Sequence, residues 1–594
     1  MLTVIVDWIY IFFTTYCLGI GFGKLTEKVT GYKMKTLDGI LLMGLVCATV
    51  YSQAFSLFGR VSLLANGILT GFCLLISVCL GKEMVVRTKD WWKNHSLIYK
   101  CILFGLCIIW VYLTCQGYMH YDTDLYHAQS IRWIEEYGAV KGLSNLHSGY
   151  AYNSSLFATT ALYSLKFLFG QSLHTINGWV AFLLTMAVLD VKDAWKRKKL
   201  LLSDYASIAA IYYMTLIADE VVSPASDYTT MCMIFIIVVK WLRQLESEDK
   251  DNITPYSLLC VAGVYAMSLK LTSGLLLVLV LKPAVRLLKE KRIKEIFFYL
   301  ISGFITAAVW MARTVILSGW LLYPFTALDL FKVDWKQPAW EVNMDAAGIT
   351  TWGRAIYNAS KTDMPITEWF GNWFRTTLSG TEKLLVLGNM AVIAVLVPTA
   401  IYLILKKKKQ HYDFLLVMAA VLASYVFWQL SAPLIRYGYA YVLLGVAVFG
   451  GWILQGLKKD RVLQILILCY GVYKIWMVGK FMYVGLANSF LVWQQDYNTY
   501  ELNSFEVDGV TFYEPGDYTD KTGYDPFPAI PKKITNFKLR GDGLSDGFMR
   551  IEEKKSKKKK DKKTSKEEKQ ETANPEEEKQ KTTKQETSNQ ENKK

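Results

Sequence analysis

Long apolar segments with almost no charge, separated by short lysine-rich connections, dominate this sequence. A run of about 20 apolar residues is long enough to cross a bilayer as a helix. The 594 residues are 53% hydrophobic and 14% aromatic, and the apolar runs lack the amphipathic periodicity expected of a soluble chain. The pattern predicts an all-α polytopic membrane protein.

Fourteen segments are predicted to cross the membrane. They are residues 2–22, 38–58, 61–81, 97–116, 174–191, 204–219, 224–243, 255–270, 274–288, 295–316, 384–405, 412–431, 436–456 and 462–484. Residues 155–169 are left out, because a span there would move the Lys196–Lys199 cluster to the side opposite the other basic connections. We expect 155–169 to lie on or dip into the outer leaflet as an interfacial helix.

With this count, all the basic connections fall on one side. They are 23–37, 82–96, 192–203, 244–254, 289–294, 406–411 and 457–461. The positive-inside rule places them in the cytoplasm, so both termini are expected outside a cell membrane that the chain crosses many times. The net charge of +15 thus encodes topology, and no nucleic-acid partner is expected. No basic region precedes the first apolar stretch, so we expect no cleavable signal peptide.

The remaining parts of the chain are expected outside the bilayer. The transmembrane domain, 1–484, carries external loops at 117–173 and 317–383. Residues 485–551 mix aromatics with Gly, Pro and Asp, which suits a small β-rich or irregular extracytoplasmic segment. From 552 to 594 Lys, Glu, Gln, Thr and Ser dominate, which predicts a disordered tail.

Five ionisable residues fall at or near the predicted outer face. They are Asp122, Asp227, Lys270, Arg313 and Arg436, of which Arg313 is expected to lie deeper. Charged groups at membrane depth are costly and usually functional. Their common level predicts a single polar site at a lipid surface.

Local sequence alone leaves two interpretations open for three of these residues. Asp122 either caps a helix over 125–137 that rests in the headgroup region or removes a proton from an acceptor hydroxyl. Asp227 follows Ser223-Pro224, which favours a carboxylate at the start of a helix. A role of Asp227 in the site is the alternative. Lys270 either snorkels to the interface or contacts a phosphate.

The loop that follows the fourth span resembles that of the GT-C glycosyltransferases. Protein O-mannosyltransferases and lipid A aminoarabinose transferases open this loop with Asp-Glu-x-x-Tyr or Asp-Glu-x-x-Phe, and Asp122 and Tyr126 match its first and last positions. Thr123 stands in place of the Glu, which leaves Asp124 as the candidate substitute. Lys270 in YAMSLKLTSG resembles their Thr-Lys-Gly turn, and Arg436 in SAPLIRYGYAY resembles the Arg-Tyr pair that opens a late span.

A wider resemblance covers most of residues 100–550. The run DTDLYHAQSIRWIEEYGAVKGLSNLHSGYAYNSSLF, with SGWLLYPF and DWKQP further on, is similar to a poorly characterised family of bacterial polytopic membrane proteins. This second resemblance is specific to the family and says little about a substrate.

The GT-C resemblance implies a GT-C-like helix bundle and an inverting transferase of the cell envelope. The enzyme would move a sugar from a polyprenyl-phosphate donor to a glycan, lipid or protein acceptor. Asp122 would be the catalytic base, and the candidate substrate-binding residues are Asp124, Tyr126, His127, Asp227, Lys270, Arg313 and Arg436. Arginine suits a phosphate because its planar fork bonds bidentately. No metal-ligand spacing of His or Cys is present, so no metal ligand is named and a divalent cation stays open as a cofactor.

Two other functions remain open at this stage. A polysaccharide polymerase or ligase of the O-antigen type would depend on arginines in the large external loop and would tolerate loss of Asp122. A transporter or flippase of lipid-linked sugars would place its charged groups near the bilayer midplane and would commonly show inverted repeats. We find no convincing repeat in the sequence.

Overall fold

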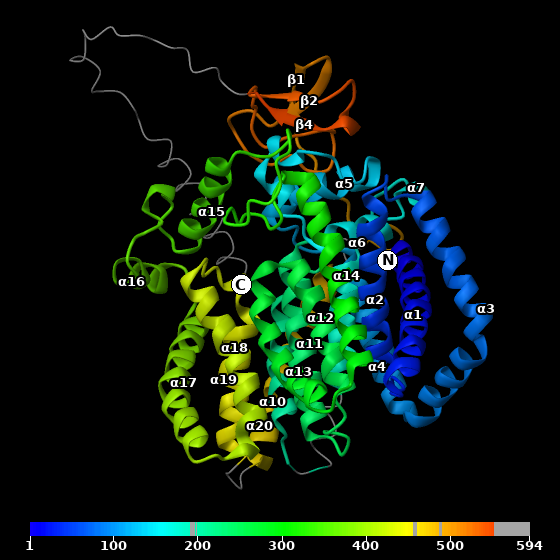
Figure 1. Cartoon of the computed structure of the whole chain (residues 1–594), viewed down its shortest axis with the longest axis vertical. Coiled ribbons are helices and arrows are strands. Elements are labelled where there is room, and N and C mark those ends of the chain that lie inside the picture. The colour runs from blue at the N-terminus through cyan, green and yellow to red at the C-terminus, as the bar shows by residue number, and fades with distance from the viewer. Residues whose placement is uncertain (190–196, 198, 456–459, 486–489, 552–594) are drawn as a thin grey trace. The chain divides into compact units, whose positions relative to one another are not determined.

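The chain folds mostly into helices, with apolar segments that match the sequence prediction of an all-α membrane protein (Figure 1). The structure is a computed structural model, and it describes residues 1–189, 197, 199–455, 460–485 and 490–551. Residues 1–551 form one compact unit. The predicted tail, 552–594, lies outside the described residues.

Within the described ranges, nine helical segments are long and apolar enough to cross a membrane. They are α1 (Leu2–Thr30), α2 (Leu37–Ser56), α3 (Leu63–Asn94), α4 (Leu97–Cys115), α11 (Ser226–Glu246), η5 with α13 (Leu271–Lys289), α14 (Ile293–Ser318), α17 (Gly380–Leu405) and η7 with α18 (Lys409–Leu430). The protein is therefore a multi-pass membrane protein, whereas the count of fourteen spans stays a prediction.

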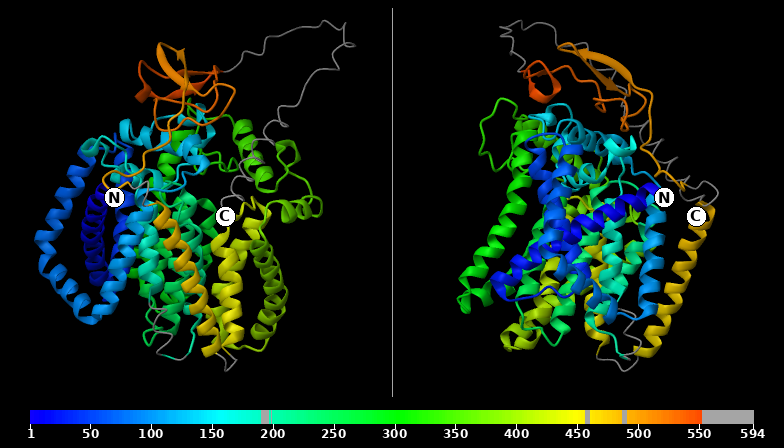
Figure 2. Two further views of the ribbon diagram at one scale, coloured as in Figure 1. Left: turned by 180° about the vertical axis from the view of Figure 1, so that it is seen from behind. Right: turned by 90° about the vertical axis from the view of Figure 1, so that its right-hand side faces the viewer.

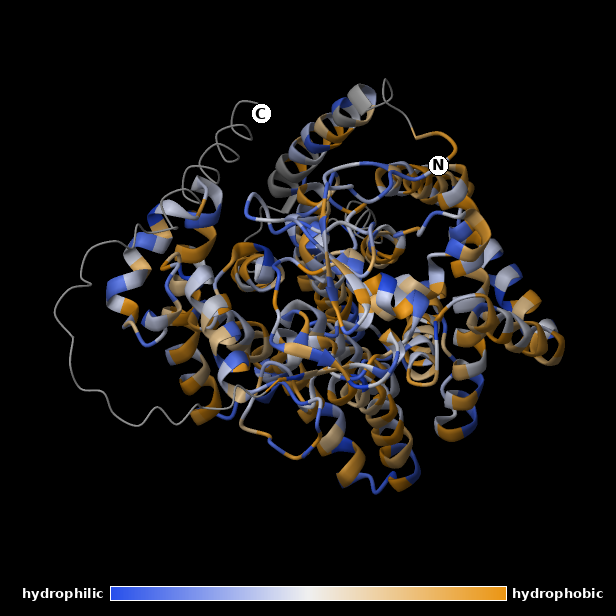
Figure 3. Ribbon diagram, turned by 90° about the horizontal axis from the view of Figure 1, so that it is seen from above, coloured by the Kyte–Doolittle hydropathy of each residue, from blue (hydrophilic) through white to orange (hydrophobic). Residues whose placement is uncertain are grey.

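Shorter helices occupy most of the other predicted spans. Apolar helices of 10–17 residues are α8 (Ile176–Val188), α12 (Thr254–Leu269) and α19 (Tyr439–Leu454), and α10 (Leu202–Leu216) has 15 residues. The last predicted span corresponds to a longer helix, α20 (Asp460–Gly485), of 26 residues. Helices α8, α10, α12 and α19 are mostly buried among their neighbours. Many apolar residues lie on the helices at the periphery, as the hydropathy colouring of the ribbon seen from above indicates (Figure 3). Exposed apolar residues of α3 such as Phe72 and Val78 suit contact with lipid.

The remaining elements lie in the connections. A π-helical turn, η1 (Thr123–His127), leads into α5 (Ala128–Glu136), and the long loop after α14 carries α15 (Ala339–Gly353) and α16 (Ile366–Thr376). The short 3-10 turn η8 (Ile435–Tyr437) precedes α19. After residue 490 come two antiparallel two-stranded sheets, β1 (Asn503–Val507) with β2 (Val510–Glu514) and β3 (Phe537–Leu539) with β4 (Phe548–Arg550).

Two glycines let α1 and α2 pack backbone against backbone. A Cβ at Gly44 would lie 1.7 Å from the carbonyl oxygen of Thr15, and one at Gly19 would lie 2.0 Å from that of Ile40. Small residues allow this close approach between helices in membranes, where packing replaces the hydrophobic effect as the main attraction. The α1–α2 pair is therefore held at a spacing that no larger residue tolerates.

The segment 155–169 differs from the expected interfacial helix. It folds into α6 (Ser155–Tyr163) and α7 (Lys166–Phe169), separated by Leu165 in a left-handed conformation. Every residue of α6 is buried, and Thr159 shares a hydrogen bond of 2.9 Å with Thr49 of α2. Hydropathy could not distinguish a helix at the membrane surface from a helix buried in the protein, because an apolar segment rich in small residues packs as well inside protein as against lipid.

The helix expected in the headgroup region is covered by the C-terminal segment instead. Trp133 of α5 is fully buried, with its ring centroid 4.7 Å from that of Phe527 and 5.8 Å from that of Phe548. Arg132 donates to the carbonyl oxygen of Tyr524 at 2.7 Å. The strands therefore lie over the loop that carries α5, beyond one end of the helices (Figure 2).

Gly44→Ala tests the α1–α2 contact. We expect it to lower the free energy of unfolding by about 1–3 kcal/mol, because the added methyl group must push the α2 backbone away from Thr15. Gly105→Ala in α4 is the matched control, since no atom lies within 4 Å of its Cβ position and alanine favours a helix. Thermal unfolding in detergent measures both variants, and equal melting temperatures would show that the close contact is not needed.

Candidate functional site

Four segments that are distant in sequence bring charged residues to one end of the helical bundle. Asp122 lies between α4 and η1, Asp227 in the first turn of α11, Lys270 between α12 and η5, and Arg436 in η8. These helix ends all lie toward β1–β4 in Figure 1. Four of the five residues that the sequence placed at one level therefore come together.

Arg436 bridges two carboxylates. Its Nη2 donates to Asp122 Oδ2 at 2.7 Å, and its Nε lies 3.3 Å from Asp227 Oδ2. The other oxygen of Asp227 accepts a hydrogen bond from Lys270 Nζ. The four charges sum to zero, which is how charged groups become tolerable in a site mostly shielded from water.

Tyr437 packs against both cations. The ammonium nitrogen of Lys270 lies 3.1 Å from the centroid of its ring, and Arg436 Nη2 donates to its hydroxyl oxygen at 3.1 Å. An aromatic face attracts a cation by its quadrupole, most strongly where water is excluded. Lys270 is therefore held inside the cluster and does not snorkel to the membrane surface.

His120 completes the surroundings of Asp122. The backbone amide of Asp122 donates to His120 Nδ1 at 3.0 Å, and His120 Nε2 contacts the Arg436 guanidinium. Burial, helped by the neighbouring guanidinium, lowers the pKa of His120 to about 4. The ring is therefore neutral at physiological pH and adds no charge to the cluster.

Asp122 is an ionised carboxylate that makes no helix cap. Burial alone would raise its pKa, but the positive charge of Arg436 is the largest opposing influence, and the pKa lies below its usual value. It occupies the N-cap position of η1, yet its side chain accepts no hydrogen bond from the backbone of that turn. The side chain is directed to Arg436 and stays available as a proton acceptor.

Asp124 binds the C-terminal segment. Its carboxylate accepts a hydrogen bond from the Tyr500 hydroxyl at 2.7 Å and one from Asn498 Nδ2 at 3.0 Å, while its carbonyl oxygen accepts from the amide of Thr522 at 2.8 Å. Burial raises the pKa of this carboxyl. Its contacts fit a residue that anchors the segment over the loop.

Tyr126 and His127 line the loop beside the cluster. His127 Nδ1 lies 3.1 Å from the Thr123 hydroxyl, which in turn bonds Ser223 at 2.6 Å. The Tyr126 ring packs edge-on against His127, with centroids 4.4 Å apart, and against Tyr152 at 5.3 Å. Both side chains support the shape of the loop that presents Asp122.

Arg313 lies apart from the charge cluster. The side chain is almost fully buried in α14, where Nε donates to Asn153 Oδ1 at 3.0 Å and Nη1 donates to the Ser56 hydroxyl. Within the part of the chain that the structure describes, it forms no ion pair. Arg313 therefore links the turn at Asn153 and the end of α2 to α14.

A second carboxyl group, Asp345 of α15, escaped the sequence analysis. It accepts hydrogen bonds from the hydroxyls of Tyr152 at 3.0 Å and Tyr323 at 3.4 Å. Burial raises the pKa of Asp345 to about 6, so it can take up or release a proton near neutral pH. Nothing in the sequence distinguished this aspartate or these tyrosines from the other polar residues around them.

The chain matches one family model, Domain of unknown function (DUF8201), over residues 1–443. The protein belongs to the DUF8201 family. No curated protein and no solved structure matches it. The DUF8201 region contains the whole charge cluster and Asp345, whereas the residues that hold Asp124 lie after it.

In this DUF8201 protein the cluster offers a proton acceptor beside two cations that can meet an anion. Asp122 provides the acceptor, and Arg436 and Lys270 provide the cations. Among the residues described, no group of three or more His, Cys, Asp or Glu side chains is arranged to hold a metal ion.

Arg436→Gln tests the bridge. It should lower the free energy of unfolding by about 1–3 kcal/mol at pH 8, because the largely shielded Asp122 carboxylate, 19% exposed, is left beside an uncharged group. Without the guanidinium, burial raises the pKa of Asp122, so the difference from the parent protein should shrink at pH 5 as the carboxyl takes up a proton. Thermal unfolding at both pH values measures the change.

The double variant Asp122→Asn with Arg436→Gln is the control for this experiment. If the two side chains interact, it should be less destabilised than the sum of the two single variants. Strict additivity, or an equal loss of stability at both pH values, would contradict the bridge.

Proposed function

We propose that this protein is a GT-C-type glycosyltransferase that moves a sugar from a polyprenyl-phosphate donor to a hydroxyl group of an extracytoplasmic glycan, lipid or protein. The observation that carries the proposal is the ion pair between Asp122 and Arg436, next to Lys270. A base for the acceptor and cations for a departing phosphate are the groups that this reaction requires.

In the proposed reaction Asp122 removes the proton of the acceptor hydroxyl as its oxygen bonds to the anomeric carbon. The bond between that carbon and the phosphate oxygen breaks, and its electron pair remains on the phosphate. Arg436 and Lys270 stabilise the charge on the leaving group, Arg436 by its planar fork. A single displacement of this kind inverts the anomeric configuration.

The zero net charge of the four side chains suggests how the donor activates the base. A donor phosphate competes with Asp122 for the guanidinium of Arg436. As the guanidinium turns to the phosphate, the pKa of Asp122 rises, since burial then acts on the carboxyl with less opposition. Asp122 becomes a stronger base only when the donor is bound.

The location of the cluster suits a lipid-linked donor. The cluster lies at the ends of helices that cross the bilayer, so a phosphate there can keep its isoprenoid chain in the apolar layer. The lysine-rich connections lie at the opposite end of the same helices, which agrees with an extracytoplasmic site by the positive-inside rule.

The two alternatives find less support in these contacts. A transporter would place its charged site near the bilayer midplane between repeated halves, but this cluster lies at helix ends. An O-antigen-type ligase would require available arginines in the loop after α14. Arg354 there is held by the carbonyl oxygens of Thr362 and Leu430, which leaves the exposed Arg375 as the one accessible arginine among the described residues of this loop.

Asp122→Asn should reduce sugar transfer at least about 100-fold, because an amide cannot accept the acceptor proton. Asp363→Asn is the matched control, an identical change at an exposed position of the loop after α14. Each variant is expressed in a strain that lacks the gene, and transfer from labelled polyprenyl-phosphate sugars is measured in its membranes at equal amounts of folded protein.

The glycan of the same deletion strain should lack one sugar residue, which the parent protein and Asp363→Asn restore. Full transfer by folded Asp122→Asn would remove Asp122 as the base. Counterflow of intact labelled lipid without covalent transfer by the parent protein would favour a transporter.

Lys270→Gln should raise the KM for the donor about tenfold or more, because one charge-assisted contact with the phosphate is lost. Lys282→Gln is the control, since Lys282 is also an ion-paired lysine. It lies in α13, outside the charge cluster, and bonds Asp413 at 2.6 Å. Steady-state transfer at varied donor concentration measures both. An unchanged donor KM for Lys270→Gln would separate Lys270 from phosphate binding.

A further inference from the structure

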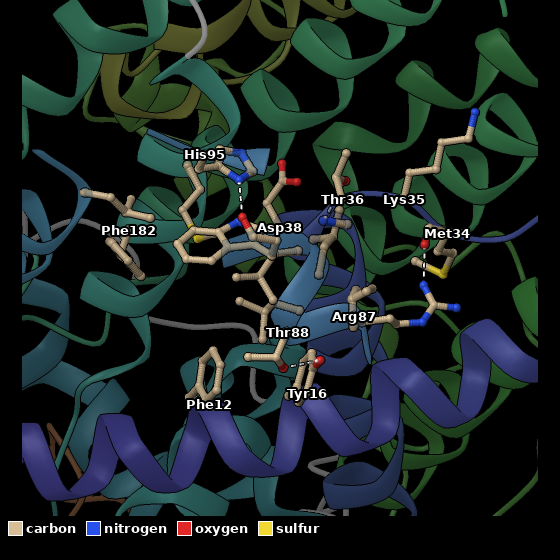
Figure 4. Close-up of a pocket in the computed structure, with 18 of the residues that line it drawn as sticks. Phe12, Tyr16, Met34, Lys35, Thr36, Asp38, Arg87, Thr88, His95 and Phe182 are labelled. Carbon is tan, nitrogen blue, oxygen red and sulfur yellow. Dashed lines mark hydrogen bonds between the residues drawn. The ribbon is translucent and has the colours of Figure 1, made fainter. Parts of the chain in front are cut away.

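A large cavity lies between the N-terminal helices and α8. Its volume is about 1650 Å³, above the roughly 300–1,000 Å³ of most small-molecule sites. The walls come from α1, α2, α4 and α8, with the last residues of α3 and α11 at one end (Figure 4). We name this cavity the α1–α4 groove.

The α1–α4 groove is separate from the proposed active site. Of the residues described, neither Asp122 nor Arg436 lines it. Lys240, which does line it, follows Asp227 by thirteen residues on α11, which corresponds to about 20 Å along the helix axis. The polar end of the groove thus lies at the opposite end of α11 from the cluster.

The walls present apolar side chains that the protein itself leaves uncovered. Ile9 is 64% exposed and Phe104 is 68% exposed, and both line the groove, as do Phe12 and Ile108. The lining runs along α1 from Met1 to Tyr16 and continues to residues 32–43 at the start of α2. A groove of this length and composition suits extended hydrocarbon chains.

One end of the groove is strongly cationic. Six basic residues line it there, against the acidic residues Asp38 and Asp90; they are Lys33, Lys35, Arg87, Lys100, Lys240 and Arg243. Lys240 pairs with Asp38 at 2.6 Å, and Arg87 pairs with Glu83 at 2.7 Å.

Two of these lysines, Lys33 and Lys100, can bind an anionic ligand. Lys33 is exposed, and Lys100 lies over the Trp92 ring at 4.1 Å from its centroid. In the described ranges, neither is ion-paired with an acidic residue. Trp91 and Trp92 at this end suit the boundary between hydrocarbon and headgroups.

We propose that the α1–α4 groove binds an anionic phospholipid, with its acyl chains along α1 and α4 and its headgroup at the cationic end. Charge complementarity selects an anionic headgroup, and the uncovered apolar walls require long chains. The lipid belongs to the leaflet on the side of the lysine-rich connections. This site is independent of sugar transfer.

Native mass spectrometry of the delipidated full chain tests the proposal, with phosphatidylglycerol, phosphatidylcholine and an isoprenoid phosphate as separate probes. We expect retention of phosphatidylglycerol in preference to the other two lipids. The double variant Lys33→Gln with Lys100→Gln should weaken phosphatidylglycerol retention about tenfold. Lys89→Gln with Lys93→Gln is the control, because both lysines are exposed on α3 and neither lines the groove.

A second variant tests the apolar part without changing a charge. Cys107→Trp places a large ring in the groove and should reduce retention of phosphatidylglycerol, whereas Cys79→Trp, at an exposed position outside the lining, should not. Equal retention of phosphatidylglycerol and phosphatidylcholine, or no effect of either groove variant, would overturn the proposal. Preferential retention of the isoprenoid phosphate would overturn it too and assign the groove to the glycosyl donor.

Discussion

The pairing of Arg436 with two aspartates is the interaction that organises one end of this protein. Each carboxylate comes from a different segment, Asp122 from the loop after α4 and Asp227 from the start of α11, and Arg436 itself precedes α19. Lys270, which follows the last residue of α12, pairs with Asp227 and so joins a fourth segment to the cluster. A buried charge without a partner is costly, so the four segments must meet whenever the chain is folded. The same requirement that stabilises the site therefore also fixes its geometry.

The sequence predicted which residues form this cluster, but it did not predict which of them contact one another. The alternation of apolar segments and basic connections sets the depth of each residue in the membrane, and Asp122, Asp227, Lys270 and Arg436 share one level. Depth says nothing about position around the bundle, however. Arg313 was expected near the same face but deeper, and it bonds Asn153 and Ser56 away from the cluster.

Long-range contacts explain what else the sequence left open. Asp124 was a site candidate because Thr123 occupies the Glu position of the GT-C motif, but its partners, Asn498 and Tyr500, lie far along the chain. The same holds for Trp133, whose aromatic side suits a headgroup layer until Phe548 covers it. Composition cannot distinguish lipid from a distant segment of the same protein, since both offer an apolar surface.

Helix α11 links the two ends of the molecule. Asp227 lies in its first turn, where the helix dipole favours a negative charge, and Arg243 lies in its last turn, where a positive charge is favoured. Lys240 ties α11 to Asp38 at the start of α2. A shift of α11 by one turn, about 5.4 Å, would break this pair and the pairs of Asp227 together. The depth of Asp227 is thus set by ion pairs within the protein at both ends of α11, so the geometry of the charge cluster does not rely on bilayer thickness.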